Sequence, residues 1–239
     1  MLACARLSLA GYFEGIYVVN LPERTDRRRE MEQELAQTDL GAKVEFFPAV
    51  RPDEAGDWPS IGARGCFRSH YDIIQRAREN GLNNVLIFED DLTLDPKLAR
   101  HAESLLAELA ERPWDLLYFG HVLELPAEPV SLQQAAPQLP IKTTHCYAVN
   151  GRAFDELLHF LELVMSRPAG HPLGGPTHYD GALSMFRTQH PARVTLYASP
   201  SLGHQRSSRS DITGRWFDEV AGLRWLADRA RSLRARVRR

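Results

Sequence analysis

The stretch NNVLIFEDDLTLD, residues 83–95, puts three carboxylates directly after four apolar residues. The apolar run, Val85–Phe88, is typical of a short buried β-strand. Glu89, Asp90 and Asp91 follow it without a spacer. Clustered carboxylates repel one another, so such a strand end calls for a cation, a ligand or water beside it. What this acidic end holds is therefore the main question that the sequence poses.

Strand-like and helix-like segments alternate along most of the chain. This order predicts an α/β fold with a mainly parallel central sheet, in which ligands bind outside the carboxyl ends of the strands. Apolar runs predict strands at 15–21, 44–50, 84–88, 114–120, 144–150 and 192–199, and helical spacing predicts helices within 22–37 and at 66–81, 96–113, 152–165 and 181–189. Loops are predicted at 51–65, 121–140, 166–180 and 200–214 from their polar, Gly and Pro content.

Bulk composition is that of an ordinary globular protein. The chain has 239 residues, 44% hydrophobic and 25% charged, with a net charge of −2. That charge argues against a nucleic-acid partner bound by bulk electrostatics. Cys4, Cys66 and Cys146 are widely spaced and form no CxxC pair, which argues against a zinc site and against a disulfide framework. The cysteines favour a reducing compartment, and no apolar run approaches the roughly 20 residues of a membrane span. We therefore expect a cytoplasmic protein.

The C-terminal part is rich in arginine. From Trp216 onward, apolar residues recur at helical spacing, which predicts a basic amphipathic helix over 213–239. Two interpretations stay open. The helix could lie on an anionic membrane surface, giving peripheral contact with the inner face of the membrane, or it could pack on the domain with its arginines in solvent.

Three kinds of site fit the acidic end of the strand. Mg2+ and Mn2+ prefer oxygen ligands and often share them with substrate phosphates, so a metal–diphosphate site fits. Solvated acids at a turn also fit. The spacing of Glu89, Asp91 and Thr93 further matches the D-x-D-x-T pattern of haloacid dehalogenase-type phosphatases. There, however, the nucleophile would be Glu instead of Asp, and its longer side chain would displace the attacking oxygen by about one bond.

Six sequence blocks in a fixed order add a family resemblance. They are IYVVNLPERTDRR, GCFRSH, VLIFEDDL, WDLLYFG, THCYAVN and RSSRSDI. In this order they resemble glycosyltransferase family 25 over about residues 15–212. The resemblance divides the chain into an N-terminal lead-in (1–14), a glycosyltransferase domain (15–212) and the C-terminal helix (213–239).

The resemblance implies a glycosyltransferase-A fold and a Mn2+ (or Mg2+) cofactor. It also implies inverting transfer of a sugar, galactose from UDP-galactose, to a glycan acceptor. Such an acceptor would belong to lipopolysaccharide, lipooligosaccharide or another cell-surface glycan, and a lipid-linked acceptor would suit the membrane-surface interpretation. The alternatives are a non-catalytic nucleotide-sugar-binding protein and the phosphatase.

The resemblance also gives the acidic residues their expected roles. Asp91 would bind the metal, while Glu89 and Asp90 would orient the ribose or the donor sugar. Asn20, Arg24 and Arg27 follow the first strand, where this fold places the nucleotide, although Arg27 also suits a solvated helix face.

The remaining candidates lie in later blocks. Ser69 and His70 would face the donor as part of GCFRSH. Asp180 would be the general base, with helix capping as the alternative. His204 would be a second metal ligand, with an exposed loop histidine as the alternative, and the expected nucleotide contacts near the C-terminus are Ser210 and Asp211.

Overall fold

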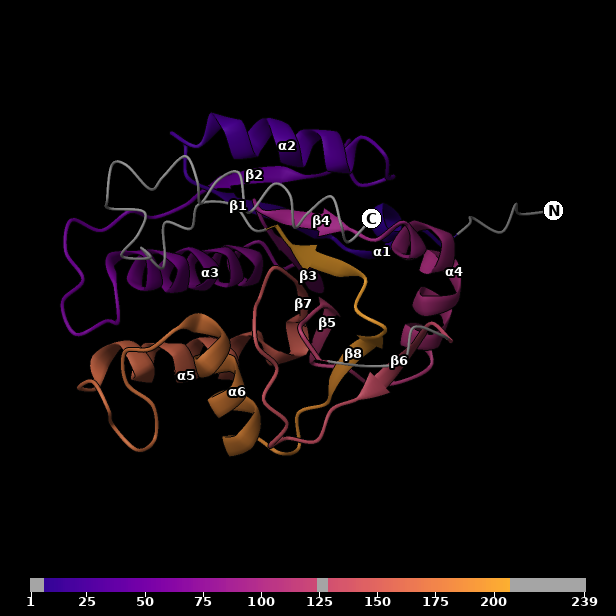
Figure 1. The fold of residues 1–239 in the computed structure, drawn as a ribbon. Helices are drawn as coiled ribbons and strands as arrows, with labels where there is room; N and C mark the ends of the chain where they lie inside the picture. The colour runs from indigo at the N-terminus through magenta and orange to yellow at the C-terminus, as the bar shows by residue number, and fades with distance from the viewer. Residues whose placement is uncertain (1–6, 124–128, 207–239) are drawn as a thin grey trace.

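The structure is a computed structural model that describes residues 7–123 and 129–206 (Figure 1). Nine strands and seven helical segments occur in this part of the chain. They are α1 (Leu9–Tyr12), β1 (Gly15–Asn20), α2 (Thr25–Leu35), β2 (Glu45–Pro48), α3 (Ile61–Glu79), β3 (Asn84–Glu89), β4 (Leu92–Leu94), α4 (Pro96–Ala110), β5 (Leu116–Gly120), β6 (Ser131–Gln134), β7 (Cys146–Asn150), the 3-10 helix η1 (Gly151–Ala153), α5 (Phe154–Ser166), α6 (Tyr179–Gln189), β8 (Thr195–Ser199) and β9 (Gly203–Gln205).

One central sheet organises the molecule. Its strand order is β2-β1-β3-β7-β5-β8-β6. Strands β2, β1, β3, β5 and β8 run in one direction, whereas β7 and β6 run against their neighbours. The expected α/β class with a mainly parallel sheet is confirmed. The reversed strand β7, which lies between β3 and β5, was not expected.

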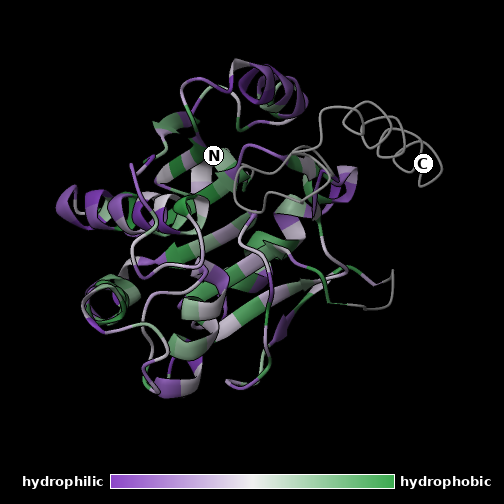
Figure 2. Cartoon of the chain, turned by 60° about the vertical axis from the view of Figure 1, so that its left-hand side comes forward, coloured by the Kyte–Doolittle hydropathy of each residue, from purple (hydrophilic) through white to green (hydrophobic). Residues whose placement is uncertain are grey.

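Helices cover both faces of this sheet. Alternate strand residues pack with α3, α5 and α6 on one face, and the residues between them pack with α1, α2 and α4 on the other. A sheet buried on both faces needs apolar residues at successive positions, which explains continuous runs such as Val85–Phe88. Figure 2 shows these strands as a largely hydrophobic layer between helices with hydrophilic outer surfaces.

Three short strands lie where the sequence predicted loops or no element. Strand β6 lies within the predicted loop 121–140, and β4 pairs with β9 just beyond the acidic residues.

Helix α3 begins at Ile61, five residues before its predicted start, because the Ser60 hydroxyl accepts a hydrogen bond from the Ala63 amide at 3.0 Å. Capping, unlike apolar spacing, is decided by a single side chain.

The folded unit also includes residues before position 15. Leu9 and Phe13, both in the predicted lead-in, are buried in the core between α1, α2 and α4. Within the described residues, none of the helices has the length and apolarity that a membrane crossing requires. The predicted C-terminal helix, 213–239, lies outside the described residues.

Candidate functional site

Three parallel strands end together at one edge of the sheet. In the register of β1, β2 and β3, Val19 lies beside Glu89 and Asn20 beside Pro48. A cavity of about 290 Å³ opens at this edge, against the first half of α3. Its apolar wall comes from residues that follow β1 and β2 and from the start of α3, and its polar side carries the three acidic residues. The cavity thus lies where ligands bind in α/β sheets.

Asp90 is held by two other residues that the sequence assigned to the nucleotide. The Asn20 side-chain amide donates to its carboxylate at 2.8 Å, and Arg27 donates to its other oxygen at 2.7 Å. All three side chains are buried. The three residues therefore bind one another. This cluster fixes the turn after β3, and their direct contact with a nucleotide stays a prediction.

Asp91 has a different environment. One carboxylate oxygen accepts from the Gln205 amide at 3.3 Å and lies 3.4 Å from Arg27, whereas the other is buried without a hydrogen-bond partner. Burial, followed by the charge of Glu89, raises the pKa of Asp91 to about 7. A bound cation would offset both effects. The carboxylate oxygen and the cavity beside it therefore fit the hard divalent metal that the resemblance implies.

The side chain of Glu89 is directed toward His70 of helix α3. It accepts a hydrogen bond from the Thr144 hydroxyl at 2.8 Å, and its carboxylate lies 3.7 Å from His70 Nε2. Burial opposes ionisation of Glu89, but the nearby His70 imidazole and the Thr144 hydroxyl outweigh it and lower the pKa of Glu89. The ring of His70 stacks on that of Tyr179, with centroids 4.5 Å apart.

The first part of the chain matches a family model. Residues 13–126 match the model described as glycosyltransferase family 25 (LPS biosynthesis protein). This match, together with curated relatives from the same family, supports the resemblance that the six sequence blocks indicated.

Individual relatives extend the match beyond residue 126. A cattle (Bos taurus) protein named as a probable inactive glycosyltransferase 25 family member 3 is 28% identical over 202 residues, which is 75% of this chain and 32% of the relative. Procollagen galactosyltransferase 1-B of Xenopus laevis is 25% identical over 210 residues, 78% of this chain and 33% of the relative. The chain thus spans about a third of the length of these curated relatives.

A solved structure is also similar to the chain. It is a glycosyltransferase involved in the glycosylation of the major capsid of PBCV-1, 14% identical to this chain. The TM-score is 0.46, with 92% of this chain and 98% of that one covered.

Within the region that matches the family model, the GCFRSH block has two functions. The Ser69 hydroxyl donates to the Gly65 carbonyl at 2.7 Å and accepts from the Val50 amide at 2.8 Å, so it fastens α3 to the loop after β2. Cys66 follows Gly65 in the sequence and His70 follows Ser69, and the side chains of Cys66 and His70 line the cavity. Of the predicted pair, His70 reaches the site, whereas Ser69 is turned to the loop.

Arg24 and Asp180 do not line the cavity. Arg24 forms an ion pair with Asp26 at 3.0 Å at the start of α2. The two carboxylate oxygens of Asp180 accept backbone N–H groups from Thr143 at 3.0 Å and Gly181 at 2.7 Å. Thr143 has a positive φ of 71°, which is unfavourable for a β-branched residue. Asp180 therefore positions the loop that supplies Thr144, and the structure does not bring it to the cavity as a general base.

His204 is directed away from Asp91. Its imidazole is largely exposed and lies 3.9 Å from Asp95, while the next residue, Gln205, lines the cavity. Successive side chains of a strand point to opposite sides, so only one of these two neighbours can face Asp91. Beside the acidic residues, the position predicted for His204 is therefore occupied by the side chain of Gln205. Ser210 and Asp211 lie outside the described residues.

Sequence reasoning missed Arg206. Its backbone amide donates to the Asp91 carbonyl at 2.6 Å, and its guanidinium donates to the carbonyls of Asp90, at 2.8 Å, and Leu92. Its position in the RSSRSDI block was the available signal. Thr93, which suggested a phosphatase, lies in β4 opposite His204 and is not part of the cavity wall. The three-residue phosphatase pattern is therefore not assembled in the cavity.

Proposed function

We propose that this protein is a metal-dependent inverting glycosyltransferase that moves a sugar from a nucleotide donor to a glycan acceptor. One observation carries the proposal. A buried Asp91 oxygen without a hydrogen-bond partner lies in a cavity at the carboxyl ends of three parallel strands, in a domain of glycosyltransferase family 25.

The two sides of the cavity suit the two parts of a nucleotide-sugar donor. The apolar wall formed by Val19, Leu21, Ala49 and Val50 offers a surface for the nucleoside. Asp91 would hold the metal at the opposite side, where the diphosphate would lie. Bound Mn2+ or Mg2+ would stabilise the negative charge of the departing nucleoside diphosphate as a Lewis acid.

Residues around Asp91 would keep it in place. Gln205 contacts one of its oxygens, and Arg206 holds the backbone carbonyls of Asp90 and Asp91 through its guanidinium and amide. The buried ion pair between Arg27 and Asp90 fixes the same turn. A metal ligand held on both sides in this way is preorganised for binding.

The proposed donor is UDP-galactose and the proposed acceptor is a cell-surface glycan. Support for galactose comes from the name of the frog relative, and support for a lipopolysaccharide-type acceptor comes from the description of the family. A lipid-linked acceptor, a cytoplasmic location and contact with the inner face of the membrane stay predictions, because the helix on which that contact depends lies outside the described residues.

A second candidate is a nucleotide-sugar-binding protein without transferase activity. Two observations favour it. The cattle relative is named as probably inactive, and both oxygens of Asp180, the predicted base, bind backbone amides. In this alternative the donor cavity would be retained and catalysis lost.

The decisive experiment measures UDP released from a panel of UDP-sugars with Mn2+ and glycan acceptors. We expect release that depends on metal, is highest with UDP-galactose, and is lost in Asp91→Asn but kept in Asp53→Asn, a control at an exposed acid outside the cavity. Metal-dependent binding of UDP without sugar release would favour the binding protein. If UDP and Mn2+ together leave the melting temperature unchanged, the nucleotide site itself is refuted.

A further inference from the structure

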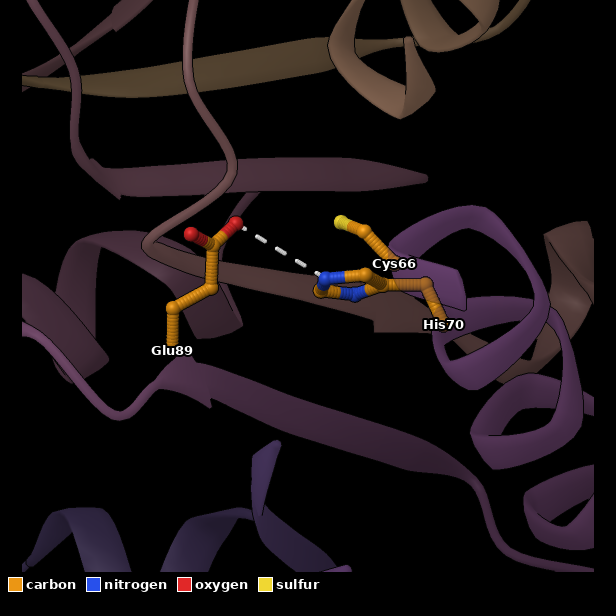
Figure 3. Close-up of side chains that lie close together, drawn as sticks. All are labelled: Cys66, His70 and Glu89. Carbon is orange, nitrogen blue, oxygen red and sulfur yellow. Dashed lines mark ion pairs between the residues drawn. The ribbon is translucent and has the colours of Figure 1, made fainter. Parts of the chain in front are cut away.

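A second donor set lies on the wall of the same cavity. The sulfur of Cys66, an imidazole nitrogen of His70 and a carboxylate oxygen of Glu89 all lie within 4.8 Å of one another (Figure 3). Cys66 and His70 are four residues apart on α3, so they project from one face of the helix. Glu89 comes from the end of β3, and Figure 3 shows it facing the other two side chains. None of these atoms belongs to Asp91, to which we assign the hard cation.

An independent observation indicates a missing ligand at this position. His70 is fully buried, yet its Nε2 atom has no hydrogen-bond partner. Burying a polar nitrogen without a partner is energetically unfavourable. The same nitrogen faces the Glu89 carboxylate at 3.7 Å, too far for a hydrogen bond but with room for an ion bound to both.

The surrounding contacts resemble the outer ligand shell of a metal site. The other ring nitrogen of His70, Nδ1, lies 3.0 Å from the Tyr147 hydroxyl, and Glu89 is oriented by the Thr144 hydroxyl. In metal sites, such partners fix the orientation of histidine and carboxylate ligands. The donors are therefore already oriented toward a common point.

Distances and donor chemistry select the class of ion. Tetrahedral zinc with bonds of about 2.0–2.3 Å requires ligand atoms about 3.3–3.8 Å apart. The His70–Glu89 separation of 3.7 Å already satisfies this, and the upper limit of 4.8 Å for the set requires a closure of about 1 Å. Sulfur and imidazole nitrogen favour zinc-like transition metals, whereas Mn2+ and Mg2+ favour oxygen.

We propose that Cys66, His70 and Glu89 bind a zinc-class transition-metal ion, with the fourth coordination position open to the cavity. The Cys66 thiol gives up its proton to solvent as the sulfur–metal bond forms, and no electron is transferred. This site differs from the CxxC pattern that the sequence lacks, since two ligands come from one helical turn and the third from a strand end. The ion would lie in the wall of the proposed donor cavity, so its binding would oppose that of a nucleotide.

The test uses the reduced, chelator-treated 239-residue chain with Co2+ as a spectroscopic probe. We expect a thiolate-to-cobalt charge-transfer band that saturates at a single equivalent and disappears when Zn2+ is added. The band should be lost in Cys66→Ala and kept in Cys146→Ala, a matched control because Cys146 is a buried cysteine in β7 that does not line the cavity. Circular dichroism checks that both variants are folded.

Two results would overturn the proposal. Without a charge-transfer band in the parent protein, His70 and Glu89 form only an ion pair with Cys66 packed beside them. A band that persists in Cys66→Ala would come from another thiol. Neither of these spectroscopic measurements requires UDP, Mn2+ or transferase activity, so failure of this site is distinguishable from failure of the proposed function.

Discussion

Asp90 and Asp91 are adjacent and equally buried, each 7% exposed, yet their environments differ. Asp90 has both oxygens occupied by Asn20 and Arg27, whereas Asp91 keeps one oxygen without a partner. The sequence could place carboxylates at a strand end, because an apolar run followed by acids is visible in the letters. It could not show which of them is already paired, since the partners come from 63 to 114 residues away along the chain.

The first prediction concerns the pH dependence that Asp91 imposes on stability. Without metal, its pKa is raised from 3.8 to about 7. Between these values the folded protein keeps a proton on Asp91 that the unfolded chain has lost, so the free energy of unfolding falls as pH rises. We expect Asp91→Asn to remove this fall, and its stability advantage over the parent should therefore grow across that interval.

Thermal unfolding of both proteins in the presence of a chelator measures this difference. Mn2+ should then raise the melting temperature of the parent near the upper end of the interval and leave that of Asp91→Asn unchanged. Parallel pH profiles for the two proteins would contradict the assignment of Asp91.

At the scale of elements, helix α3 shows how one sequence block serves both packing and the site. If Gly65 had a Cβ atom, it would lie 2.3 Å from the Val50 carbonyl oxygen, so only glycine allows this close approach. Ser69 then fastens the same loop from the next turn. With the helix held in this way, Cys66 and His70 are directed into the cavity.

The second prediction compares two glycines near helix starts. Gly65→Ala should destabilise the protein by about 1–3 kcal/mol, because the new methyl group would push the backbone of α3 away from the Val50 carbonyl. Gly181→Ala in α6 is the matched control. There a Cβ would have only ordinary contact, 3.4 Å from Thr177, and alanine should stabilise the helix by up to about 1 kcal/mol.

Urea denaturation of the two variants gives both values on one scale. Equal shifts of the same sign would show that the contact between α3 and the loop is not the constraint that we infer.

Elements also differ in how well the sequence predicted them. Long apolar or periodic segments such as β1, β3, β5 and α4 were placed within a few residues, because burial on the sheet dictates their composition. The short strands β4, β6 and β9 were missed. Strands of three or four residues carry too little pattern, and their pairing depends on partners that are distant in sequence.

At the scale of the whole molecule, the region that matches the family model is smaller than the folding unit. Residues 13–126 include β1, β2, β3 and β5 but not β7, which lies between β3 and β5 in the sheet. Thr144, Gln205 and Arg206, which contact the acidic residues, also lie beyond it. The reversed β7 was not predictable from alternation alone, since the sequence pattern gives strands but not their direction.

The third prediction follows from this arrangement. A fragment of residues 13–126 should show no cooperative thermal unfolding, because removing β7 separates two central strands and exposes the core on both faces. The 239-residue chain is the control, and its transition should be cooperative. A fragment that unfolds cooperatively and binds UDP with Mn2+ would show that the later strands are dispensable.

The pairing of β4 with β9 has a consequence for the order of events on the ribosome. Asp91 emerges 114 residues before Gln205, the β9 residue whose side chain donates a hydrogen bond to it. During translation, the acidic residues therefore appear long before Gln205 and Arg206, which contact them in the folded protein. The proposed nucleotide and metal would therefore meet a complete site only after residue 205 has been synthesised, so neither would act as a template for the early stages of folding.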